Sequence, residues 1–171
     1  GLGKAYLHGF AWALQNNYDY IFEMDADFSH NPKDLNHLFE ACKNADMSIG
    51  SRYSKGVNVV NWPMGRVLLS YFASIYVRTI LGIPIHDTTA GFVCFSRKVL
   101  ETIDLNDIKL KGYGFQIEMK FRAFKKGFKI VEVPIIFTNR ELGTSKMNGG
   151  IIHEAVFGVL NLKWKSIIGR L

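Results

Sequence analysis

Residues 21–32 read IFEMDADFSHNP, and this stretch decides the fold class that the sequence predicts. The apolar run that ends at Met24 is typical of a buried strand. Asp25 and Asp27 follow it at once, and Asn31 and Pro32 then offer a helix N-cap and a first helical residue. The stretch therefore predicts a strand that ends in two carboxylates and leads into a helix.

Helical and strand patterns alternate on both sides of this stretch. The alternation predicts a single α/β domain over residues 1–171, with a mixed, mostly parallel sheet and helices on both faces. Pro134 lies inside the last β-prone run and marks that run as an edge strand or a strand end. Helices are expected at 2–14, 32–42, 63–83, 112–127 and 151–171 with a short one from 97, and strands at 20–24, 46–50, 92–95 and 128–137.

The two carboxylates suggest a metal site. Carboxylates this close repel one another unless a cation lies between them. Mg²⁺ and Mn²⁺ suit such a pair, and they commonly complete their coordination with phosphate oxygens of a substrate. Ser29 is a further candidate ligand, directly or through water. The alternative is an ordinary surface turn, since Asp is common after strands.

The charge of the chain is unevenly distributed. Residues 109–171 contain 12 Lys and Arg against 4 Asp and Glu, whereas residues 1–108 contain 9 against 11. A basic half of this kind favours an anionic partner, such as phospholipid or a phosphorylated substrate. Nucleic acid ranks last, because no nucleic-acid-binding motif is found in the sequence.

The segment 63–83, PMGRVLLSYFASIYVRTILGI, is apolar almost all round, and Arg66 and Arg78 are its only charges. Such a helix is buried in the core or faces lipid. The uncharged part is about half of the roughly 20 residues that a bilayer-spanning helix needs. Segments 63–83 and 151–171 are therefore candidates for helices that lie on a membrane surface.

Six motifs in order carry a family resemblance: GLGKAYLHGFAWAL, MDADFSHNPKDL, GSRY, DTTAGF, GYGFQIEM and VPIIFTNRELGTSKM. Together they resemble the dolichol-phosphate mannose synthase branch of the family 2 inverting glycosyltransferases, over nearly all of the chain. The resemblance implies a GT-A, Rossmann-like fold and transfer of mannose from GDP-mannose to a polyprenyl or dolichyl monophosphate. It also implies a peripheral protein on the cytoplasmic face of a membrane.

The resemblance assigns roles to particular residues. Asp25 and Asp27 are expected to hold Mg²⁺ or Mn²⁺ on the donor diphosphate. Ser29 is the third candidate metal ligand, at a position where family members often carry Gln. Asp87 matches an acidic position beside the sugar. The basic positions around the lipid phosphate and the diphosphate correspond to Arg52, Arg66, Arg140 and Lys146. The catalytic candidates are Asp25, Asp27, Asp87 and Arg140.

Members of the family normally begin with two further strand and helix units, which hold the nucleotide base. The chain is therefore expected to be N-terminally incomplete. The sequence consequently does not determine the donor sugar, and it does not identify a partner subunit. One alternative is transfer of glucose or another sugar by the same family. A second, from a different class, is a binding or scaffolding fragment without catalysis.

Overall fold

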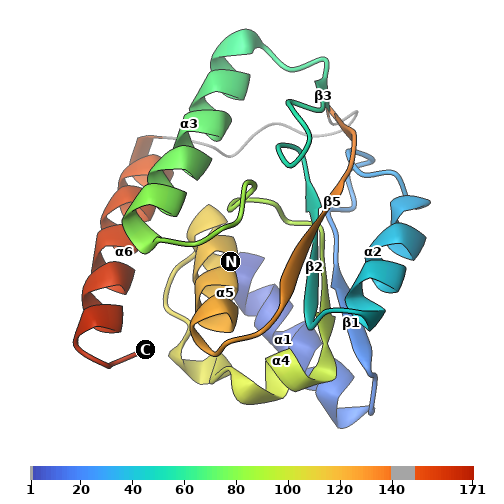
Figure 1. The fold of residues 1–171 in the computed structure, drawn as a ribbon, viewed down its shortest axis with the longest axis vertical. Coiled ribbons are helices and arrows are strands. Elements are labelled where there is room, and N and C mark those ends of the chain that lie inside the picture. Colours follow the sequence, from blue (N-terminus) through green and yellow to red (C-terminus); the bar gives the residue numbers. More distant parts are fainter. Residues whose placement is uncertain (1, 140–148) are drawn as a thin grey trace.

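The computed structural model describes residues 2–139 and 149–171, with side chains from residue 154 onward in the second range (Figure 1). Helices and strands alternate as the sequence predicts. In chain order the elements are α1 (Leu2–Gln15), β1 (Tyr20–Glu23), α2 (Asp34–Lys43), β2 (Met47–Ser51), β3 (Val59–Val60), α3 (Met64–Leu81), β4 (Val93–Ser96), α4 (Arg97–Thr102), the 3₁₀ turn η1 (Leu105–Asp107), α5 (Tyr113–Lys125), β5 (Ile130–Pro134), β6 (Phe137–Thr138) and α6 (Gly149–Ile167).

The central sheet has four strands in the order β1-β4-β2-β5. β4 runs antiparallel to both of its neighbours, and β2 and β5 pair in parallel. β1, β2 and β5 consequently point the same way, and their carboxyl ends meet at one edge of the sheet. The residues that follow these three strands are brought together there.

The expected mixed sheet is confirmed, but parallel pairing is in the minority: β2 and β5 are the parallel neighbours in this sheet, and the other two strand pairs are antiparallel. After β2 the chain passes through α3 and returns at the carboxyl edge, where the backbone N–H of Gly50 donates to the carbonyl of Phe92. A strand that starts at that edge runs back against its neighbours. Pro134, in contrast, is the last residue of the edge strand β5, as its position in the sequence predicted.

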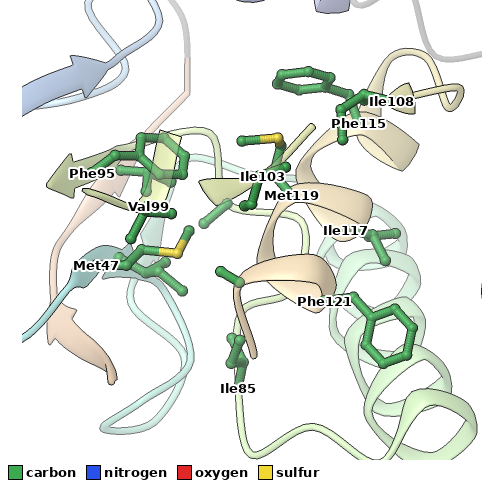
Figure 2. Close-up of a cluster of buried hydrophobic side chains, with 14 of the residues drawn as sticks. Met47, Ile85, Phe95, Val99, Ile103, Ile108, Phe115, Ile117, Met119 and Phe121 are labelled. Carbon is green, nitrogen blue, oxygen red and sulfur yellow. The ribbon is translucent and has the colours of Figure 1, made fainter. Parts of the chain in front are cut away.

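Helices cover both faces of the sheet (Figure 1). On one face α2 packs over a small cluster that includes Leu38, Cys42 and Phe92. The larger core lies on the other face, where side chains from β2, β4, α4 and α5 converge, among them Met47, Phe95, Val99, Phe115 and Met119 (Figure 2). Burial of these apolar side chains supplies the main stabilisation of the domain.

α3 and α6 lie side by side outside α5 (Figure 1). The Tyr76 hydroxyl on α3 donates to the Val156 carbonyl on α6 at 3.1 Å. Both helices keep large apolar side chains in solvent, including Phe72 at 60% exposure and Trp164 at 61%. No helix within the described residues is both long and apolar enough to cross a bilayer.

Candidate active site

Asp25 lies two residues beyond β1, at the carboxyl edge of the sheet. Its side chain is 40% exposed, and the Tyr6 hydroxyl donates to its Oδ1 at 3.5 Å. Burial, together with the charges of Glu23 and Asp25, raises the pKa of Tyr6 above its ordinary value. The phenol therefore stays protonated and holds the carboxylate as a hydrogen-bond donor.

Asp27 is held from the other side of the turn. The backbone N–H and the hydroxyl of Ser29 both donate to Asp27 Oδ1, at 3.1 and 2.5 Å. Phe28 between them has φ 61°, a left-handed conformation that is uncommon for a bulky residue. Since the buried Ser29 hydroxyl already binds Asp27, the geometry favours Ser29 as the residue that orients this carboxylate, and its role as a metal ligand stays a prediction.

His30 is buried behind the two carboxylates, at 6% exposure. Its ring packs against Phe92 and Phe137, with centroids 4.8 and 5.0 Å away, and its Nε2 lies 4.0 Å from Asp25 Oδ2. Neither ring nitrogen has a hydrogen-bond partner among the described residues. Burial, with the nearby charge of Arg52, lowers the pKa of His30 to about 4, so the imidazole is neutral near pH 7.

Arg52 and Asp87 form a buried ion pair at the same edge. The Arg52 Nε and Nη2 donate to the two carboxylate oxygens of Asp87 at 2.7 and 2.6 Å, and Nη2 also donates to Thr89. Asp87 is completely buried, and although burial opposes its ionisation, Arg52 keeps its pKa below the ordinary value. The structure thus brings together a predicted phosphate-binding arginine and a predicted sugar-side aspartate.

Arg66 lies next to this pair, at the start of α3. Its guanidinium carbon is 3.9 Å from the centre of the Trp62 ring, and its Nη1 donates to the Asn139 side chain at 3.1 Å. The Arg52 guanidinium lies over the same Trp62 ring, at 5.5 Å. Arg66 is only partly buried, so it supplies positive charge at the surface of the site. The other two predicted basic residues, Arg140 and Lys146, lie outside the described residues.

A buried polar group beneath Asp25 was not predicted from the sequence. Glu23 on β1 accepts a hydrogen bond from the Gln116 side chain on α5, and the Lys120 ammonium donates to the Ala90 carbonyl at 2.6 Å. Burial raises the pKa of Glu23 above its ordinary value and lowers the pKa of Lys120 below its ordinary value. Two patterns point to this group: Glu23 is a charged residue that ends the apolar strand before Asp25, and Gln116 and Lys120 are one helical turn apart.

The carboxylate pair fits a hard divalent ion that is shared with a ligand. Within residues 2–139 and 154–171, whose side chains the structure describes, no three His, Cys, Asp or Glu side chains are grouped so that they alone would hold a metal. Two carboxylates at a sheet edge, with the remaining positions filled by water and phosphate oxygens, are a common arrangement for Mg²⁺. Asp25 and Asp27 therefore suit that role without a third protein ligand.

Comparison with known proteins gives the family. The model of glycosyl transferase family 2 matches residues 1–104. Over all of its length the chain is 49% identical to an undecaprenyl-phosphate mannosyltransferase of Micrococcus luteus and 52% identical to a polyprenol monophosphomannose synthase of Mycolicibacterium smegmatis. It is 38% identical to a dolichol-phosphate mannosyltransferase of Pyrococcus furiosus. The chain spans 72%, 64% and 47% of these three relatives, respectively.

Solved structures agree on the fold. Glucosyl-3-phosphoglycerate synthase from Mycobacterium tuberculosis, in complex with phosphoglyceric acid, superposes with a TM-score of 0.70 over 96% of this chain and 55% of that one. Its sequence identity is 16%, so it supports the GT-A type fold alone. The expected family resemblance and fold class are confirmed, and the chain is a glycosyltransferase domain. It belongs to glycosyltransferase family 2.

Proposed function

We propose that the protein transfers mannose from GDP-mannose to a polyprenyl or dolichyl monophosphate, with the assistance of Mg²⁺ or Mn²⁺. The observation that carries the proposal is identity of 49% and 52%, along the whole chain, to two proteins named as mannosyltransferases or phosphomannose synthases of polyprenol-type lipids. The position of Asp25 and Asp27 at the carboxyl edge of the sheet, where open α/β folds bind ligands, supports it.

The acceptor chemistry explains which groups the site needs. A phosphate monoester has a second pKa of about 6 and is largely ionised near neutral pH. Its oxygen is therefore already a nucleophile, and no general base has to remove a proton from it. The protein must instead hold two anions, the acceptor phosphate and the donor diphosphate, close to one sugar carbon, which requires fixed positive charge and positioning.

Asp25 and Asp27 would hold the divalent ion, which supplies charge neutralisation for the departing diphosphate. Tyr6 and Ser29 orient the two carboxylates. Arg66 is placed to meet a phosphate, because a partly exposed guanidinium can bind phosphate oxygens in a bidentate manner. Arg140 and Lys146 complete the proposed phosphate-binding set by family resemblance.

The ion pair of Arg52 and Asp87 changes the part that Arg52 plays in this proposal. Its Nε and Nη2 are already bound to Asp87 and Thr89. The pair is nearly neutral as a unit, so its contribution to anion binding is smaller than that of an unpaired arginine. We infer that Arg52 mainly fixes the loop that carries Asp87; the role of Asp87 beside the sugar stays a prediction from the family resemblance.

A lipid acceptor requires a membrane surface, and α3 and α6 provide apolar side chains for it. Met64, Leu68 and Phe72 follow one another at helical spacing on α3, and each is more than 40% exposed. Phe157 and Trp164 on α6 are likewise exposed beside it. We propose that these helices rest in the headgroup region on the cytoplasmic face of a membrane, with Lys163, Lys165 and Arg170 near anionic lipid.

Transfer of labelled mannose to a polyprenyl monophosphate by the full-length protein tests the function. We expect product with GDP-mannose, loss of product on chelation, and recovery with Mn²⁺ or Mg²⁺. Asp25→Asn and Asp27→Asn should each lower the rate at least about 100-fold, since each removes a charge that holds the metal. Asp19→Asn is the matched control, because Asp19 precedes the opposite end of the same strand and is exposed.

Two results would refute the proposal in different ways. Product formed from a glucose nucleotide but not from GDP-mannose would assign the domain to another sugar of the same family. No GDP-mannose binding at all by the full-length protein would support a scaffolding role.

A further inference from the structure

Lys120 is a fully buried lysine on α5, at 0% exposure. Burial of an ammonium group costs free energy unless the group is paired and hydrogen-bonded. The hydrogen bonds of Lys120 therefore indicate its role in the fold. Its Nζ donates to the Ala90 carbonyl at 2.6 Å and to the Gln116 carbonyl at 3.4 Å. The charges that act most on it are those of Glu23 and Asp87, both buried. Lys120 thus joins α5 to the segment 87–91, and its charge acts on Glu23 of β1.

Segment 87–91 passes directly beside the metal-binding candidate Asp25. A Cβ atom placed on Gly91 would lie 3.9 and 4.0 Å from the carboxylate oxygens of Asp25, and 3.8 Å from the Gln116 amide nitrogen. Gly91 therefore lies between the Asp25 carboxylate and the Gln116 side chain of α5. A shift of the Ala90 and Gly91 backbone would change the space that Asp25 occupies.

Gln116 completes the connection from the helix to the strand. Its amide donates to Glu23, whose side chain is on the same face of β1 as that of Ile21 and whose exposure is 1%. Glu23 is two residues before Asp25 and belongs to the strand that delivers it. The group made of Glu23, Gln116 and Lys120 therefore contacts both supports of Asp25: the strand before it and segment 87–91 beside it.

We propose that Lys120 is a positioning residue for the carboxylate pair: by binding the Ala90 carbonyl it fixes segment 87–91 against Asp25. The inference rests on the proposed function, in that Asp25 is taken as a ligand of the divalent ion. Lys120 does not touch the ion or the substrate. It acts as residues behind metal ligands do, which set the orientation of those ligands.

The test compares Lys120→Met with the double variant Glu23→Gln/Lys120→Met. The single variant removes the ammonium charge that acts on the buried Glu23 carboxyl and is expected to be less stable. The double variant leaves no ionisable group at either position, so its urea unfolding midpoint should lie closer to that of the wild type. The anchor of the Ala90 carbonyl is still missing in it. Lys125→Met is the matched control, because Lys125 is an exposed lysine of the same helix.

Two measurements are made on each full-length variant. One is the Kd of Mn²⁺ in the presence of GDP, by electron paramagnetic resonance, and the other is amide hydrogen exchange of residues 88–92. We expect both Lys120 variants to weaken Mn²⁺ binding about 10- to 100-fold and to exchange faster at 88–92. Lys125→Met should match the wild type in both.

Wild-type Mn²⁺ binding and wild-type exchange in the double variant would overturn the inference, since Lys120 would then serve only to pair with Glu23. If the wild-type protein binds no Mn²⁺, the proposed function fails instead. Exchange at 88–92 then decides the inference by itself: faster exchange in the double variant supports the anchoring of this segment, and unchanged exchange refutes it.

Discussion

Asp87 binds Arg52 through the side chain and the backbone at once. Its Oδ2 accepts from both the backbone N–H and the Nε of Arg52, at 2.9 and 2.7 Å, while its Oδ1 accepts from Nη2. Asp87 is in turn held by Glu132, which accepts from its backbone N–H at 2.9 Å. The pair therefore links the end of β2 to segment 87–91 and, through Glu132, to the edge strand β5.

Asp87→Asn should strongly destabilise the protein. The substitution preserves the shape of the side chain but leaves the Arg52 charge buried without its counter-ion, which costs about 3–5 kcal/mol. The free energy of unfolding, measured by urea denaturation at pH 7, should fall by that amount. Glu101→Gln is the control, since it removes the same kind of charge from the Arg97 pair, where Glu101 is 50% exposed, and should cost no more than about 1 kcal/mol. Equal losses in the two variants would contradict a buried, structurally important pair.

Gly50→Ala should destabilise the centre of the sheet. A Cβ atom on Gly50 would lie 3.1 Å from side-chain carbons of both Phe92 and Ile135, which are themselves buried. Overpacking of this kind costs about 1–3 kcal/mol, which urea denaturation would detect.

Gly9→Ala tests whether space, and not the loss of glycine, causes this effect. Gly9 lies inside α1, and nothing lies within 4 Å of a Cβ placed there. This variant should be stabilised by about 0.5–1 kcal/mol, because alanine favours the helix. Destabilisation of both variants by a similar amount would refute the packing argument.

The sequence predicts the elements of this fold well, because their signals are local. The apolar run before Asp25 and the turn at Asn31 place β1 and α2, although α2 begins at Asp34 since the Asn31 side chain first accepts from the Lys33 N–H in a turn. The direction of β4 and the pairing of β3 with β6 carry no such signal. They depend on where the chain returns after long connections, which periodicity does not report.

The site shows the same division. Asp25 and Asp27 can be recognised as site candidates from the sequence alone, because they directly follow the apolar run that predicts the end of a strand. The partners of Arg52 and Glu23 are 35 and 93 residues away in the chain, and only the packed structure brings them together. Buried pairs of this kind were therefore the part of the site that the sequence did not predict.

Stability at acidic pH should depend on His30. Its pKa is lowered to about 4 in the folded protein, below the ordinary value of 6.5. Between these two values the unfolded chain binds a proton that the folded chain does not, so the free energy of unfolding falls as the pH decreases. The total loss across this window is about 3 kcal/mol.

His30→Leu should remove this dependence, although it changes packing between Phe92 and Phe137. Urea denaturation from pH 7 to pH 4.5, with chelator present, should give a shallower loss of stability for this variant than for the wild type. His37→Leu is the control, because the His37 side chain is 69% exposed, and its pH dependence should follow the wild type. Parallel curves for His30→Leu and the wild type would contradict the prediction.

Binding to anionic vesicles should depend on the apolar face of α3 and α6. Phe72→Ser and Trp164→Ser each remove a large side chain that is about 60% exposed, and its burial in lipid is worth about 1.5–3 kcal/mol. Each variant should therefore lower the vesicle partition coefficient about tenfold or more, as measured by co-sedimentation. Trp12→Ser on α1 removes a similarly exposed aromatic, at 53%, and should leave partitioning unchanged. An equal loss in all three variants would show that general hydrophobicity, and not this pair of helices, determines binding.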